Sequence, residues 1–160
     1  PPPLAGACAS HGGAGLGPHG TPPLAPRPVL RGLAVALIGA HVSIEGGAWR
    51  AFDRARDLGC ETFQIFTKNQ LQWFGAPLPL GECERFYRAW RESGIRVVVA
   101  HASYLINLAG EEELRRRSVT ALVQELQRCD ALGIDRVVVH PGSHGRASRE
   151  EGLERVRRSL

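Results

Sequence analysis

The sequence contains no methionine, and Lys68 is the single lysine among its 20 lysine and arginine residues. No apolar stretch approaches the roughly 20 residues that a membrane-spanning helix needs. The first residues also lack the basic-then-apolar pattern of a secretory signal peptide. These absences predict a cytoplasmic protein without a membrane partner. The lack of methionine agrees with a fragment of a longer coding sequence.

Two kinds of short motif are also missing. The four cysteines show no CxxC spacing, which disfavours a zinc site built from thiolates. Cys60, Cys83 and Cys129 fall within expected helices or strands, so reduced thiols are favoured over disulfides. The turn at residues 39–47 matches neither GxGxxG nor GxxxxGK[ST], which disfavours a dinucleotide or P-loop site there.

The composition predicts one folded domain with a basic surface. The formal charge of +4 permits binding to a polyanion without requiring it. Residues 1–32 are rich in proline, glycine and alanine and contain few residues that can fill a core. We therefore expect a disordered tail at 1–32 and a folded domain at 33–160.

A near-repeat dominates the folded part of the sequence. Residues 93–101 read SGIRVVVAH and residues 132–140 read LGIDRVVVH. Each copy has a glycine break, a β-branched run and a final histidine. Such a run predicts a strand buried on both faces of a parallel sheet. Its histidine then lies at the rim where α/β proteins place ligands and metals.

Strand and helix patterns alternate four times along the chain. Strands are expected at 35–41, 60–67, 95–101 and 134–140, and helices at 46–58, 82–93, 111–132 and 150–160. The fold class is α/β with parallel strands. Either an open doubly wound sheet or the first half of a (β/α)8 TIM barrel fits, and the missing phosphate motifs favour the barrel. A complete barrel needs roughly 250 residues, so open edges and self-association are expected here.

Polar residues follow each expected strand, and the histidines among them point to a metal. Neutral imidazole is a good zinc ligand, so His101 and His140 are the candidate metal ligands. His41 and His144 are candidates for a supporting role, in which a hydrogen bond from the histidine orients a metal ligand. A satisfied structural histidine is the alternative for each of them.

Two further loops carry residues suited to nucleic acid. Lys68, Asn69 and Gln70 follow the second strand, where a positive charge and short amides suit contact with phosphate oxygens. A solvated loop is the alternative. Tyr104 and Leu105 form an aromatic–aliphatic pair that can wedge into a base stack, unless they belong to the core at the base of the loop.

Five stretches resemble the endonuclease IV family of apurinic/apyrimidinic endonucleases, also called AP endonuclease family 2. The resemblance runs from about residue 38 to residue 160. The stretches are GAHVS at 39–43, FTKNQ at 66–70, HASYLINLA at 101–109, QRCDALG at 127–133 and HPGSH at 140–144.

The resemblance implies a zinc-dependent DNA repair nuclease on a (β/α)8 barrel. Such enzymes hydrolyse the phosphodiester 5′ to abasic sites in double-stranded DNA during base excision repair, using up to three Zn²⁺ ions. The expected location is then cytoplasmic, with nucleoid association in a prokaryote. The resemblance makes His101 and His140 zinc ligands, and it places Tyr104 and Leu105 at the lesion. It also places Asn69 and Gln70 in a DNA-contacting loop, and His41 near the site.

The sequence departs from this pattern in two ways. Leu71 stands where a close family member has an inserting arginine. The remaining zinc ligands, and the catalytic residues with them, are expected in a second half of the barrel beyond Leu160. We expect a monomer when the barrel is complete, and little nuclease activity from these residues alone. The alternatives are a metal-dependent sugar isomerase or epimerase barrel and a non-catalytic DNA-binding remnant.

Overall fold

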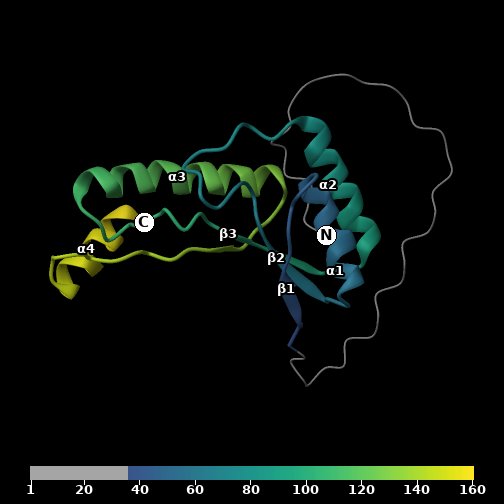
Figure 1. Cartoon of the computed structure of the whole chain (residues 1–160), viewed down its shortest axis with the longest axis horizontal. Helices are drawn as coiled ribbons and strands as arrows, with labels where there is room; N and C mark the ends of the chain where they lie inside the picture. The colour runs from purple at the N-terminus through teal and green to yellow at the C-terminus, as the bar shows by residue number, and fades with distance from the viewer. Residues whose placement is uncertain (1–35) are drawn as a thin grey trace.

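The computed structural model of the chain describes residues 36–160 (Figure 1). The tail predicted at 1–32 lies outside the described residues, and so do Cys8, His11 and His19. The described elements are β1 (Gly39–His41), η1 (Ala48–Arg50), α1 (Ala51–Asp57), β2 (Thr62–Phe66), α2 (Leu80–Ser93), β3 (Val97–His101), α3 (Glu112–Ala131), β4 (Val137–Val138) and α4 (Arg149–Ser159).

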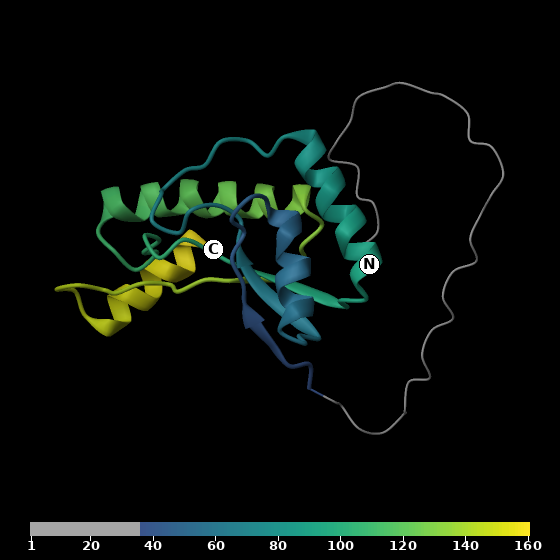
Figure 2. The same cartoon turned by 45° about the vertical axis from the view of Figure 1, so that its right-hand side comes forward.

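The four strands form one parallel sheet in the order β1-β2-β3-β4. Sequential parallel strands joined by right-handed crossovers place their helices on one face of the sheet. This arrangement confirms the predicted half of a (β/α)8 barrel. Figure 2 shows α1 and α2 running side by side next to the strands, while α3 extends toward α4. All four strands end at the same rim.

Three expected elements differ clearly from those observed. The first strand was expected at 35–41, but among the described residues only Gly39–His41 pair with β2. The first helix does not begin at residue 46, because Gly46 and Gly47 have φ angles of 78° and 124°, outside the helical region. The helical turns begin at Ala48, whose N–H donates to Glu82 Oε1 at 2.5 Å. The last strand was expected at 134–140, but β4 is shorter because only Val137 and Val138 are in register with β3.

A first hydrophobic cluster fills the space between the sheet and helices α1 and α2. Phe52 lies at its centre, with ring centroids 4.9 Å from both Phe63 and Phe86 in edge-on arrangements. Strand β2 presents Phe63 and Ile65 to this cluster. Thr62, Gln64 and Phe66 alternate onto the opposite face, which is the inner face in a barrel.

A second cluster anchors the loop that follows β3. Ile106 and Leu108 of that loop are buried together with Ala121 and Leu122 of α3. The loop between residues 102 and 111, called the β3 loop below, is therefore held against a long helix rather than left free above the sheet. Loops after the other strands are named in the same way: the β1 loop (42–47), the β2 loop (67–79) and the β4 loop (139–148).

Three glycines end the helices that precede β2, β3 and β4. Gly59, Gly94 and Gly133 follow α1, α2 and α3 with φ angles of 69°, 74° and 67°, the left-handed conformation that ends helices. Within the described chain, none of the helices combines the length and apolar character needed to span a membrane.

The three described cysteines, Cys60, Cys83 and Cys129, are reduced and form no disulfide. Burial, reinforced by the nearby Glu125 carboxylate, raises the pKa of the Cys129 thiol to about 12. This thiol is therefore protonated at neutral pH and acts as a small core residue rather than as a nucleophile.

Candidate functional site

Three histidines meet at the rim of the sheet. His41 and His101 end β1 and β3, and His140 follows β4 by two residues. The ring centroid of His101 lies 5.0 Å from that of His140 and 6.2 Å from that of His41. Parallel strands bring these residues together although they are far apart in the chain.

Two of the three imidazoles are oriented by hydrogen bonds. His101 is buried, and its Nδ1 lies 2.7 Å from the carbonyl oxygen of Ala102. Because a carbonyl can only accept, Nδ1 carries the proton and Nε2 keeps its lone pair. His41 Nδ1 lies 3.0 Å from Gln64 Oε1. His140 is exposed.

Phe66 packs against the rings of His41 and His101 on the inner face of the sheet. It was not identified as a site residue from the sequence. Its ring centroid lies 4.4 Å from His41, 5.2 Å from His101 and 5.4 Å from Tyr104. Phe66 is paired in register with His101, so both side chains lie at the same height on the sheet. Counting the alternation of β2 from buried Phe63 and Ile65 identifies Phe66 as a residue of the inner face.

Tyr104 packs against the Phe66 ring and is 57% exposed. Its ring stacks on that of His140 with an interplanar angle of 23° and a centroid distance of 6.0 Å. Leu105 beside it is half-buried. Tyr104 is therefore not part of the core at the base of the loop, and its role as a wedge stays a prediction.

In the β2 loop, the Asn69 side chain is exposed and the charged Lys68 side chain is buried. The Lys68 side chain is only 4% exposed, and its Nζ lies 2.7 Å from Glu125 Oε1. Its ammonium also donates to the Gln72 carbonyl at 2.8 Å. The positive charge is therefore neutralised inside the protein, and Asn69 is the exposed residue of the KNQ stretch, with Gln70 half-buried.

The carboxylate that receives Lys68 was not singled out from the sequence. Glu125 lies on the face of α3 that also carries Ala121, Leu122 and Cys129. A charged residue on the apolar face of a helix predicts a buried partner. The partner is Lys68, the only lysine in a chain whose other basic residues are arginines.

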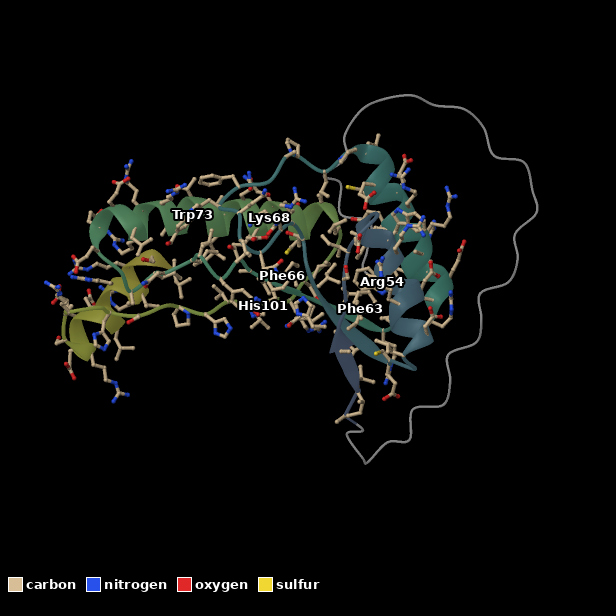
Figure 3. All side chains as sticks on the ribbon, in the orientation of Figure 1. Arg54, Phe63, Phe66, Lys68, Trp73 and His101 are labelled. Carbon is tan, nitrogen blue, oxygen red and sulfur yellow. The ribbon has the colours of Figure 1, made fainter. Side chains whose placement is uncertain are left out.

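The rim also opens into a cleft. Between the β1 and β2 loops lies an open cavity of about 490 Å³, lined by polar and apolar residues that include His41, Ser43, Glu45, Phe66, Asn69 and Gln70. Figure 3 shows Lys68 and Trp73 along α3, with Phe66 and His101 below them.

The β3 and β4 loops are joined by backbone hydrogen bonds. The Pro141 carbonyl accepts from the N–H groups of Leu108 and Ala109 at 2.8 and 3.1 Å. Gly142 packs so closely that an added Cβ would lie 2.2 Å from Asn107 Oδ1. His144 lies farther along, and its Nδ1 is 2.7 Å from the Ala147 carbonyl. His144 therefore anchors its own loop and is not among the rim histidines.

The donor set for a metal is incomplete among residues 36–160. No group of three or more His, Cys, Asp or Glu side chains there is arranged to hold an ion. His101 and His140 supply two neighbouring imidazoles, one with its Nδ1 already committed. Zinc sites normally use at least three protein ligands, so these residues fit part of such a site.

The parallel half-barrel with histidines at its rim places the chain in the class of TIM-barrel proteins. Comparison with known proteins then identifies the family. The family model described as "Xylose isomerase-like TIM barrel" matches residues 52–160. The chain belongs to this family.

Its relatives include two curated proteins named "Probable endonuclease 4". The one from Halorhodospira halophila is 48% identical over 124 residues, which cover 77% of this chain and 42% of that protein. The one from Citrifermentans bemidjiense is 46% identical over 121 residues, covering 75% and 43%. The chain thus spans less than half the length of these relatives. The predicted resemblance to the N-terminal portion of endonuclease IV proteins is confirmed.

Solved structures agree with this assignment. Endonuclease IV from Thermus thermophilus is similar with a TM-score of 0.66 and 38% identity, covering 77% of this chain and 46% of that one. A D-psicose 3-epimerase matches with a TM-score of 0.55 and 12% identity, covering 76% and 46%. At that identity, the epimerase shares the fold alone.

Proposed function

We propose that this chain forms the lesion-binding half of a DNA repair endonuclease that hydrolyses the phosphodiester 5′ to abasic sites. The observation that carries the proposal is the exposed Tyr104 ring packed against His101 and His140, on a loop that Ser103 joins to Gln70. Relatives named endonuclease 4 support the same chemistry. The catalytic residues belong, on this proposal, to the half of the barrel that the relatives have in addition.

The exposed part of the rim has the chemistry that a damaged duplex requires. Tyr104 offers an aromatic face to bases that have lost a stacking partner, and base–aromatic stacking is worth about 1–3 kcal/mol per base. Asn69 and Gln70 offer amides for phosphate oxygens. Exposed Leu71 follows them on the same loop and adds an apolar side chain of the kind that inserts at a weakened step. A missing base lowers the energy needed to open the stack.

His101 and His140 would hold zinc as part of a larger donor set. His41 would fix the orientation of Gln64 on the neighbouring strand through the hydrogen bond between its Nδ1 and Gln64 Oε1. A bound zinc supplies a Lewis acid that polarises a phosphoryl oxygen and neutralises its charge. In this proposal, the residues of this chain bind the ion and the duplex, and the Ala102 carbonyl holds the His101 ring in the tautomer that leaves Nε2 free.

Zinc binding tests the histidine assignment separately. We expect His101→Ala and His140→Ala each to lower the zinc affinity of the chain about tenfold or more, because each removes a donor; even outer-shell changes cost 10- to 100-fold. Competition with a chromophoric chelator measures this. His144→Ala is the matched control and should leave the affinity unchanged. Equal affinities in all three variants would contradict the assignment.

Competitive DNA binding tests the function itself. The chain should bind a duplex containing a tetrahydrofuran abasic analogue at least tenfold more tightly than the intact duplex, because only the lesion accepts Tyr104 without unstacking a paired base. Fluorescence anisotropy at fixed salt measures both affinities, since salt changes every protein–DNA affinity. Equal affinities would leave only charge-driven binding and refute the proposal. Low incision by this chain is expected and does not bear on the outcome.

A further inference from the structure

A buried hydrogen-bond network beneath the rim joins the β2 loop to the β3 loop. We propose that Ser103 and Glu125 are positioning residues that hold these loops at a fixed spacing, so that Asn69, Gln70 and Tyr104 engage one lesion together. This inference rests on the proposed function. It assigns a role in lesion recognition to two side chains that lie inside the protein.

Ser103 makes the direct link between the loops. Its hydroxyl donates to the carbonyl oxygen of Gln70 at 2.7 Å, across 33 positions of sequence. The same Oγ accepts from the N–H of Leu105 at 3.2 Å. The side chain is buried, so water does not compete for these bonds. Ser103 thus fixes Gln70 on one side and the turn that presents Tyr104 on the other.

Glu125 makes a second link from below. One carboxylate oxygen accepts from Thr67 Oγ1 at 2.7 Å. The other lies 2.7 Å from Lys68 Nζ and accepts from the N–H of Ser103 at 3.2 Å. A single buried carboxylate therefore receives donors from the start of the β2 loop and from the β3 loop. The three donors are adjacent in sequence to rim residues: Thr67 to Phe66, Lys68 to Asn69 and Ser103 to Tyr104.

The same helix holds the rest of the β2 loop. Gln124 Oε1 accepts from the N–H of Gly75 at 2.8 Å, and the Arg128 guanidinium donates to the Thr67 and Ala76 carbonyls. The Arg117 guanidinium lies 4.4 Å over the Trp73 ring. Helix α3 is thus a common support for the β2 loop, and the Ser103 hydroxyl adds a direct bond from the β3 loop to Gln70.

The test replaces Ser103 by alanine and compares it with a matched serine elsewhere. Ser93 also accepts from the N–H two residues ahead, that of Ile95 at 3.1 Å, but it donates locally, to the Trp90 carbonyl at 2.9 Å, and joins no second loop. It lies at the end of α2, before β3 begins and therefore away from the rim. Both variants lose one hydroxyl that donates to a carbonyl and accepts from the N–H two residues ahead, so a general effect of serine removal appears in both and only Ser103→Ala breaks a link between loops.

We expect Ser103→Ala to lower the preference for an abasic over an intact duplex about fivefold, the equivalent of one net hydrogen bond. Affinity for the intact duplex should stay within twofold. Hydrogen exchange should rise in peptides from both the β2 and β3 loops. Ser93→Ala should change neither the preference nor the exchange of these loops. A merely structural role would change stability without changing the ratio of the two affinities.

The outcomes separate this inference from the proposed function. If the unmodified chain prefers the lesion but Ser103→Ala keeps the full preference, the positioning role is wrong and the proposed function stands. If the unmodified chain shows no preference, the proposed function fails and the inference fails with it. If Ser103→Ala does not fold by circular dichroism, Thr67→Val removes a donor to Glu125 without changing volume. It must then show the same fall in preference, or the inference is overturned.

Discussion

Replacement of Glu125 by alanine is expected to lower the free energy of unfolding by about 3–5 kcal/mol, the range found when one partner of a buried ion pair is removed. The substitution leaves the Lys68 ammonium, whose side chain is 4% exposed, without its counter-ion. It also strands the Thr67 hydroxyl and the Ser103 N–H. Urea denaturation followed by circular dichroism measures the loss.

Two variants control this result. Glu113→Ala removes an exposed partner of Arg116 on the same helix and should leave stability nearly unchanged, because solvent screens such pairs. The double change Lys68→Met with Glu125→Leu removes both charges and should recover most of the loss. A Glu125→Ala protein as stable as Glu113→Ala would show that the buried pair contributes nothing to the fold.

Replacement of Tyr104 by alanine is expected to weaken binding to the abasic duplex about tenfold or more, from a stacking energy of about 1–3 kcal/mol. Tyr104 is exposed and takes no part in the hydrophobic clusters, so the fold should survive the change. Anisotropy with the lesion-containing and intact duplexes measures the effect.

Tyr104→Phe is the matched control, because it keeps the ring and removes only the hydroxyl. It should bind the lesion within about threefold of the unmodified chain. If Tyr104→Ala retains full affinity, the ring does not enter the stack and the wedge assignment is lost. If Tyr104→Phe is as weak as Tyr104→Ala, the hydroxyl rather than stacking carries the contact.

The fold followed from the sequence because its signals are local. The β-branched runs ending at His101 and His140 and the glycines at 59, 94 and 133 each depend on neighbouring residues alone. The limits of β4 depended instead on pairing with β3, which a run of valines does not encode. The start of the first helix depended on two glycine φ angles.

The same distinction applies to the candidate site: features set by local sequence were predictable, and features set by distant contacts were not. The convergence of His41, His101 and His140 was predictable, since parallel strands end at one rim. The burial of Lys68 was not, because its partner lies far along the chain on α3 and both residues suit a solvated surface equally well by type. The alternation of β2 places Phe66 on the inner face, but its position beside His101 depends on the register between two strands.

Topology alone does not separate two classes of ligand for this rim. A D-psicose 3-epimerase shares the fold with a TM-score of 0.55 at 12% identity, so the fold by itself does not choose between a small sugar and a duplex. What distinguishes the two classes here is the exposed aromatic and the amide loop beside the histidines. These features favour a duplex over a small sugar as the ligand.

The most direct test of this account is the competition between an abasic and an intact duplex of identical sequence for the unmodified chain. We expect at least tenfold tighter binding to the abasic duplex at the same salt concentration. Equal affinities that fall together as salt is raised would contradict it, because binding would then come from net charge alone.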